Sequence, residues 1–284
     1  MWLIETYTWK LRFFHNPPEK YAILSHAWAE EELTFQEFRS LEGVGGALAE
    51  QEARRIRNKK GFKKIQQCCH LALSNNLRLA WVDTCCIDKA SSAELSESIN
   101  SMFHWYKEST ICYVYLEDVT SVSVTTKPNE ADPYKPDEPS RWYTRGWTLQ
   151  ELLAPARVDF YNSSWQKIGS KWGLRKEIAS ITGIGELDLI SYDRSRTSIA
   201  QKMSWASRRN TTRIEDAAYC LLGIFGIHMP LLYGERGNAF RRLQERLIQT
   251  SSDQSIFCWN NTSYVRAPDA GEPWGMLAGS PRDF

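Results

Sequence analysis

Residues 21–25 read YAILS, a short apolar run that follows the loop HNPPEK at residues 15–20. Short apolar runs bounded by turn residues are typical of buried strands in a parallel sheet. The run ends at Ser25 and is followed at once by His26 and Trp28. Because α/β folds bind ligands at the C-terminal ends of their strands, these three residues are candidates for binding a substrate.

A helix and a second strand are predicted after this run, toward the C-terminus. Residues 79–83 read LAWVD, which has the same short apolar character as the first strand. A strand, a helix and a strand in this order indicate a right-handed βαβ unit. The helix is predicted from apolar residues that recur at helical spacing after Gly61, namely Phe62, Ile65, Cys69, Ala72 and Leu73.

The alternation continues along the first half of the chain. A second helix is predicted to start near Ser92, and the run ICYVYL at residues 111–116 predicts a third buried strand. Two more short strands are expected at residues 158–161 and 165–168. This order of elements favours a three-layer α/β fold over an all-helical one.

The second half of the chain is predicted to be mainly helical, with helices at residues 171–181, 198–206, 214–224 and 236–249. Thr212 and Glu215 have the spacing of a capping box, and residues 255–259 read as a strand. We therefore expect a parallel-sheet core flanked by helices over residues 1–165, a helical part over 166–259, and a loop-rich tail over 260–284. This tail is expected to lead into further domains of a longer protein.

Composition narrows the class of protein. The 284 residues carry 35 Lys and Arg against 34 Asp and Glu, so no broad positive field attracts nucleic acid. No apolar run approaches the roughly 20 residues needed to span a bilayer. The seven cysteines include two adjacent pairs but no CxxC spacing, which favours buried thiols in a reducing compartment over a metal site. A soluble, cytoplasmic protein without a resident cofactor is expected.

The segment RWYTRGWTLQELLAP at residues 141–155 is dense in aromatic and charged residues and predicts a short helix that ends before Pro155. On such a helix, Trp147 and Glu151 are spaced i and i+4 and lie on one face. An aromatic wall beside a carboxylate suits a flat, positively charged ring. The alternative is that Trp147 is part of the core and that Glu151 pairs with Arg145 at the surface.

Other residues admit two interpretations each. Asp83, at the end of the second strand, can orient a ribose hydroxyl or brace the following loop. Cys85 or Cys86 could form a nucleophilic pair with His26, although no adjacent feature lowers the pKa of either thiol. The Pro-rich loop at residues 119–140 is either a lid or a disordered insertion. A basic cluster between Arg54 and Lys60 is interpreted as a solvated loop or helix face rather than a phosphate site.

Three ordered blocks closely resemble the fungal heterokaryon incompatibility (HET) domain. They read YAILSHAW at 21–28, WVDTCCIDK at 81–89 and RGWTLQELLAP at 145–155, and the stretch from Arg213 to Glu245 resembles the C-terminal continuation of the family. The resemblance extends from about residue 20 to 259. Ala29 departs from it, because the family usually has glycine after the tryptophan. The resemblance implies a cell-death effector in fungal non-self recognition.

HET domains are in turn similar to TIR domains, which implies a TIR-like, flavodoxin-like sheet. In enzymatic TIR domains, a glutamate on an aromatic-flanked helix is essential for cleaving the nicotinamide–ribose bond of NAD. The matching position is Glu151, which the resemblance implies as the catalytic residue. It further implies NAD as substrate. The substrate-binding residues expected on this basis are Ser25, His26, Trp28, Asp83 and Trp147.

Three hypotheses follow. In the first, the chain is an NAD hydrolase that acts through Glu151. In the second, it is a TIR-like signalling module that triggers cell death by self-association without catalysis. In the third, it is a cysteine hydrolase. A carboxylate near the ribose would stabilise the positive charge that builds up when an N-glycosidic bond breaks, which agrees with the first.

Overall fold

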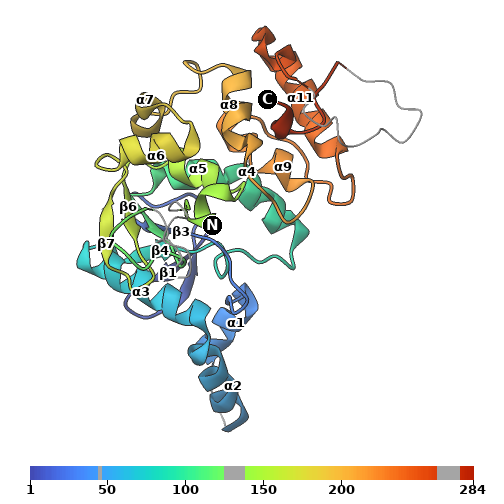
Figure 1. Ribbon diagram of the computed structural model, residues 1–284. Coiled ribbons are helices and arrows are strands. Elements are labelled where there is room, and N and C mark those ends of the chain that lie inside the picture. The colour runs from blue at the N-terminus through green and yellow to red at the C-terminus, as the bar shows by residue number, and fades with distance from the viewer. Residues whose placement is uncertain (44–46, 125–137, 261–275) are drawn as a thin grey trace.

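The computed structural model describes residues 1–43, 47–124, 138–260 and 276–284. Within these ranges, seven strands form one mixed sheet in the order β2-β1-β4-β3-β5-β6-β7 (Figure 1). The strands are β1 (Trp2–Glu5), β2 (Leu11–Phe13), β3 (Ala22–His26), β4 (Leu79–Trp81), β5 (Ile111–Tyr115), β6 (Val158–Tyr161) and β7 (Lys167–Ser170). The α/β class predicted from the sequence is confirmed.

The centre of the sheet is parallel and its edges are antiparallel. Strands β4, β3, β5 and β6 run in the same direction; β3, β4 and β5 were predicted as buried apolar runs, and β6 as one more short strand. The edge strands extend the expected parallel core, because β1 pairs antiparallel with β2 and β4, and β7 pairs antiparallel with β6. The β1–β2 hairpin was missed since neither strand shows a regular alternation of apolar and polar residues.

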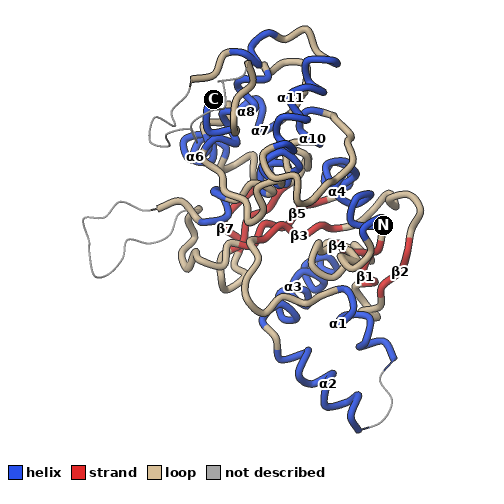
Figure 2. The backbone as a smooth tube through the Cα atoms, turned by 90° about the vertical axis from the view of Figure 1, so that its right-hand side faces the viewer, coloured by secondary structure: helices blue, strands red, loops and turns tan. Residues whose placement is uncertain are grey.

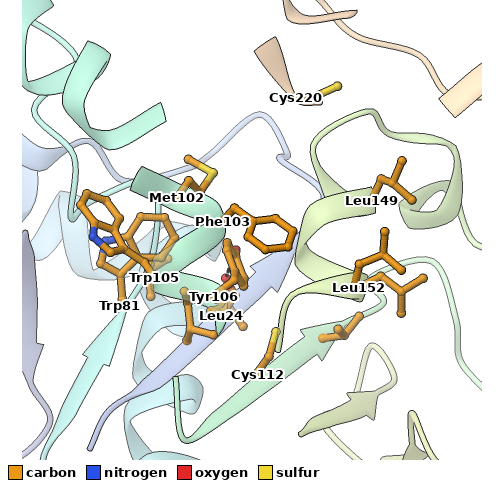
Figure 3. Packing of buried hydrophobic residues seen from close by; sticks show 14 of the residues in the cluster. Leu24, Trp81, Met102, Phe103, Trp105, Tyr106, Cys112, Leu149, Leu152 and Cys220 are labelled. Carbon is orange, nitrogen blue, oxygen red and sulfur yellow. Dashed lines mark hydrogen bonds between the residues drawn. The ribbon is translucent and has the colours of Figure 1, made fainter. Parts of the chain in front are cut away.

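Helices cover both faces of the sheet. Helix α3 (Lys60–Ser74) lies on one face, and α4 (Ser92–Glu108) and α5 (Thr148–Leu153) lie on the other (Figures 1 and 2). Helix α4 begins at Ser92, near the expected start. Its N-cap is Ser91, whose side chain accepts a hydrogen bond from the Glu94 N–H. Figure 3 shows the core that α4 and α5 form with the sheet, where the Tyr106 hydroxyl donates to the Leu24 carbonyl at 3.0 Å.

Helices α1 (Phe35–Ser40) and α2 (Ala47–Asn58) extend away from the sheet (Figure 2). The basic cluster runs along α2 and into the start of α3, and Arg55 in it pairs with Glu52 at 2.6 Å. This region is therefore a charged helix surface, as interpreted. At Gly61 a Cβ atom would lie 2.6 Å from the Glu31 carbonyl oxygen, so only glycine lets the loop that follows β3 pack against α3.

Helices dominate after β7, as predicted. They are α6 (Arg175–Thr182), α7 (Glu186–Ile190), α8 (Ile199–Ser207), α9 (Asp216–Tyr219), α10 (Leu222–Phe225) and α11 (Asn238–Thr250). The capping box at Thr212 and Glu215 was wrong: the Glu215 carboxylate accepts hydrogen bonds from the Gly234 and Arg236 N–H groups instead, at 2.8 and 3.0 Å. The predicted strand at 255–259 is a 3₁₀ turn, η3 (Gln254–Phe257), so this prediction was also wrong.

The last residues fold back onto the helical part. The Gln244 side chain forms two hydrogen bonds with the backbone of Ala278, both at 2.9 Å. A capping box between Ser280 and Asp283 closes the 3₁₀ turn η4 (Pro281–Asp283) within the tail that was predicted to be rich in loops. The domain boundaries at residues 165 and 259 stay predictions. Of the loop at 119–140, residues 125–137 lie outside the described residues, so its interpretation as a lid stays a hypothesis as well.

None of the described helices is both long and apolar enough to cross a membrane. The described residues also contain no group of three or more His, Cys, Asp or Glu side chains that could hold a metal ion.

The contact between α10 and α4 requires a glycine, which yields a test of the packing. A Cβ atom at Gly223 would lie 2.1 Å from the Cβ of Phe103. We expect Gly223→Ala to lower the free energy of unfolding by about 1–3 kcal/mol, because the two helices would have to separate. Urea denaturation checks this. Gly237→Ala is the matched control, since nothing lies within 4 Å of a Cβ there, and an equal loss in both variants would contradict the argument.

Candidate active site

The segment 141–155 meets the C-terminal end of β3. Trp142, in the 3₁₀ turn η2 (Arg141–Thr144), donates its indole N–H to the Ser25 hydroxyl at 2.9 Å. The Ser25 hydroxyl in turn donates to the carboxyl group of Glu151 on α5. All three residues are buried, and Glu151 is only 6% exposed. The pairing of Glu151 with Arg145 at the surface, the alternative raised by the sequence, is therefore replaced by a buried bond to Ser25.

A cavity of about 310 Å³ opens in front of Glu151. Five of the six residues expected at the site line it: His26, Trp28, Asp83, Trp147 and Glu151. Ser25 lies behind Glu151 and reaches the cavity through that residue. The side chains that complete the lining are Ile87, Lys89, Leu95, Ile99, Met102, Arg145, Thr148, Thr212, Arg213, Asp216 and Tyr233. We call this cavity the cleft.

Asp83 is held as an anion on one side of the cleft. His26 Nε2 lies 3.1 Å from one carboxylate oxygen, and the Trp28 indole N–H donates to the other at 2.7 Å. Burial alone would raise the pKa of Asp83. The hydrogen bond from His26, the nearby charge of Lys89 and the hydrogen bond from Trp28 outweigh it and lower the pKa to about 2. Lys89 lies 3.6 Å from the centre of the Trp28 ring. Asp83 is therefore bonded to side chains at the end of β3 and just after it, and it presents a negative charge to the cleft.

Behind His26 lies a buried ion pair. Lys64, on α3, bonds to Glu32 and lies 3.0 Å from His26 Nδ1. Because an ammonium group can only donate, Nδ1 accepts this bond and Nε2 carries the proton that faces Asp83. Lys64 thus fixes the tautomer of a residue in the cleft from the far side.

Loss of this ammonium group should be costly. We expect Lys64→Met to lower the free energy of unfolding by roughly 3 kcal/mol, since a buried ion pair that loses one partner leaves the other unpaired. Denaturant titration is the measurement. Lys63, the neighbouring exposed lysine, supplies the control variant Lys63→Met. If both substitutions have the same small effect, the buried pair does not stabilise the site.

The pKa of Glu151 is shifted in the opposite direction to that of Asp83. Burial, and after it the negative charge of Asp83, raise the pKa of Glu151 to about 8. A neutral carboxyl also fits its neighbours: Ser25 donates to it, and it can donate to the hydroxyl of Tyr106, whose own proton goes to the Leu24 carbonyl. The two carboxyl groups therefore have pKa values that the site pushes far apart. Such divergence is a feature of acid–base and charge-stabilising catalysis.

Comparisons with known proteins identify the family of the chain. The family model for heterokaryon incompatibility protein (HET) matches residues 21–141, and a domain of unknown function (DUF8212) matches residues 238–274. The vegetative incompatibility protein HET-E-1 of Podospora anserina is 42% identical over 236 residues, which are 81% of this chain. The chain carries a HET domain. The matched region is 16% of that relative's length, and no solved structure matches the chain.

The second half of the chain contributes to the cleft, which sequence reasoning missed. Asp216 bonds to the Tyr233 hydroxyl at 3.0 Å and to the Trp147 indole, so it holds the aromatic wall in position. Burial raises the pKa of Asp216 above its usual value. Arg213 lies over the ring of Tyr233 at 4.4 Å. The block from Arg213 to Glu245 had been noted as family-like, but nothing in its spacing pointed to the cleft.

The cysteine pair does not form a nucleophilic site in this HET domain. Cys85 is fully buried, and burial raises its pKa well above the usual value. The Cys86 thiol accepts a bond from the Val82 N–H at 3.4 Å, and the two ring nitrogens of His26 are occupied by Lys64 and Asp83. Cys85 and Cys86 are therefore core residues, and the structure does not support the cysteine-hydrolase hypothesis.

Proposed function

We propose that this HET domain is a cytoplasmic cell-death effector of fungal vegetative incompatibility that hydrolyses the nicotinamide–ribose bond of NAD, with Glu151 as the catalytic carboxylate. The role in incompatibility is supported by the relative from Podospora anserina, which is described as a vegetative incompatibility protein. The enzymatic part is carried by one observation. Asp83 and Glu151 line a single aromatic cleft with pKa values of about 2 and about 8.

The cleft suits a cationic ring. Nicotinamide in NAD carries a positive charge on its ring nitrogen, and the indoles of Trp28 and Trp147 offer flat walls to it. The ionised Asp83 attracts this charge. A cation close to Glu151 favours its charged form, so substrate binding would draw the proton from Glu151.

The reaction balances with water alone. The bond between ribose C1′ and the nicotinamide nitrogen breaks, and its electron pair neutralises the ring. The carboxylate of Glu151 stabilises the positive charge that develops on the ribose. Water then adds to C1′ and gives its proton to Glu151. This proton returns Glu151 to its neutral resting state, so the products are nicotinamide, ADP-ribose and the one proton that Glu151 lost when the substrate bound.

The arrangement of strands supports a TIR-like, flavodoxin-like core as part of this proposal. Counted along the chain, the four parallel strands have the order 2-1-3-4, which is the start of the flavodoxin-like order 2-1-3-4-5. Ser25 and His26 close the first of these strands and Asp83 follows the second. The chain places the second of these strands on one side of the first, and the third and fourth on the other side. This topological switch point lies at the first strand, next to the cleft.

The test is direct. Purified, concentrated protein incubated with NAD is expected to release nicotinamide, measured by chromatography. NAD that remains intact under conditions where the protein is folded and self-associated would overturn the enzymatic proposal.

A non-catalytic module is the second candidate. One observation favours it: the Glu151 carboxyl is already bonded to Ser25 and Tyr106, as a structural residue would be. In this case the chain would trigger death by TIR-like self-association, and further domains of a longer protein would regulate it. Toxicity that persists in Glu151→Gln, and that is lost in surface variants unable to assemble, would favour the module. Loss of toxicity in a Glu151→Gln protein that still assembles would exclude it.

A further inference from the structure

The cleft continues into a second cavity of different character. This second cavity has a volume of about 250 Å³ and shares Trp28, Arg145 and Thr212 with the cleft. Its other described lining residues are Ala27, Arg141, Thr144, Asn210 and Thr211, so hydroxyl, amide and guanidinium groups surround it and carboxylates do not. The cleft itself is lined by three carboxyl groups, those of Asp83, Glu151 and Asp216. We call the second cavity the annex.

The walls of the annex are locked together by backbone bonds. Gly146 N–H donates to the Asn210 carbonyl at 2.9 Å, and Asn210 N–H donates to the Thr144 carbonyl at 2.6 Å. The Arg209 guanidinium donates to the Arg145 carbonyl at 2.8 Å. A Cβ atom at residue 146 would lie 2.5 Å from the Thr211 methyl group, so this approach requires glycine. Residues far apart in sequence are thereby fixed side by side around the annex.

Two arginines that line the cleft, one of which also lines the annex, make no ion pair within the described part of the chain. Among the described residues, no carboxylate lies within 4 Å of the guanidinium of Arg145 or of Arg213, whereas Arg141 is paired with Glu117. Arg213 instead rests over the Tyr233 ring. Unpaired guanidinium groups beside threonine hydroxyls are suited to phosphate oxygens, which arginine binds through two parallel hydrogen bonds.

We propose that the pyrophosphate of a dinucleotide binds where the annex meets the cleft, with Arg145, which lines both cavities, and Arg213, which lines the cleft next to the shared Thr212, as its anion contacts. This inference rests on the proposed function for the nicotinamide end of the substrate. A dinucleotide such as NAD is cationic at the nicotinamide and anionic one ribose away. The ionised Asp83 lies beside the aromatic walls of the cleft, and Arg145 and Arg213 lie at or next to residues that the cleft shares with the annex, so the two ends of such a ligand meet charges of the opposite sign. The substrate class is therefore the pyridine dinucleotide rather than the nucleoside.

ADP-ribose is the probe, because it contains the pyrophosphate but no nicotinamide and its binding does not depend on cleavage. Calorimetry is expected to show binding to the wild-type chain that Arg145→Gln and Arg213→Gln each weaken about tenfold or more. The matched control is Arg241→Gln on α11, whose side chain is 68% exposed and pairs with Glu245. Arg213 is exposed, so its variant remains informative if Arg145→Gln fails to fold.

Each other outcome has a defined meaning. Absence of ADP-ribose binding, or equal binding by wild type and both variants, would overturn the annex proposal. Equal affinities for inorganic pyrophosphate and ADP-ribose would reduce the annex to a simple anion site and overturn its assignment to a dinucleotide. Arginine-dependent binding of ADP-ribose together with intact NAD would support the annex while excluding hydrolysis.

Discussion

Glu151→Gln is expected to lower the rate of nicotinamide release from NAD by about a hundredfold or more, which is the usual cost of removing a charge-stabilising or acid–base group. Glutamine keeps the shape of the side chain and cannot ionise. It can accept the bond from Ser25 and donate to Tyr106, as the neutral carboxyl of Glu151 does. The fold should therefore persist while the charge needed in the transition state is lost.

The control for this experiment is Glu245→Gln, a change of the same chemistry at an exposed position on α11. It should leave nicotinamide release unchanged. Circular dichroism and the unfolding transition of each variant report whether the fold is kept. Full activity in folded Glu151→Gln would contradict the catalytic role of this residue.

The second large effect concerns stability. The Glu151→Gln variant is expected to become more stable than the wild type as pH rises. In the unfolded chain Glu151 loses its proton near the usual pKa of 4.5, but in the folded chain the pKa is about 8. Between these values the folded state binds one proton more than the unfolded state, so the free energy of unfolding falls as pH increases. The slope is about 1.4 kcal/mol per pH unit, which amounts to a few kcal/mol between pH 5 and pH 8.

Denaturant titrations of the wild type and Glu151→Gln at several pH values in this window measure the effect. Asp83 does not contribute to the difference, because its pKa is lowered to about 2 and its stabilising effect is complete above the unfolded value of 3.8. Glu151→Gln should gain on the wild type steadily as pH rises and level off above pH 8. Parallel curves for the two proteins would show that Glu151 is charged in the folded state already.

Both results together distinguish a functional from a structural residue. Replacement of a residue kept for stability lowers the free energy of unfolding, whereas replacement of a destabilising functional group raises it. A Glu151→Gln protein that is more stable than the wild type at pH 8, yet inactive, would identify a buried carboxyl retained for its chemistry.

Much of the fold could be predicted from local patterns. Strands β3, β4 and β5 were recognised because each is a short apolar run, and α3 and α4 because their apolar residues recur at helical spacing. The β1–β2 hairpin and the antiparallel edges were not predicted. Strands of three or four residues carry too few positions for a period to stand out, and their pairing depends on partners that are distant in sequence.

The site divides in the same way. Five of the six expected residues line one cleft, because the ends of neighbouring parallel strands and the helix after them meet at one edge of the sheet. Lys64, Asp216 and Tyr233 were not expected. They reach the site from α3 and from the helical part of the chain, where nothing in their local sequence distinguishes them from ordinary buried polar residues.

The sequence by itself determined which residue types stand at the strand ends, such as Ser25 and Asp83, and on the following helix, such as Glu151, as well as the family to which those blocks belong. Only the tertiary structure decided their electrostatic states. Asp83 and Glu151 are both carboxylic acids, and the sequence assigns them similar pKa values. Burial beside Ser25 and Tyr106 keeps one neutral, and bonds from His26 and Trp28 keep the other charged. Desolvation and hydrogen bonding depend on what surrounds a side chain in space, so no local pattern in the chain encodes them.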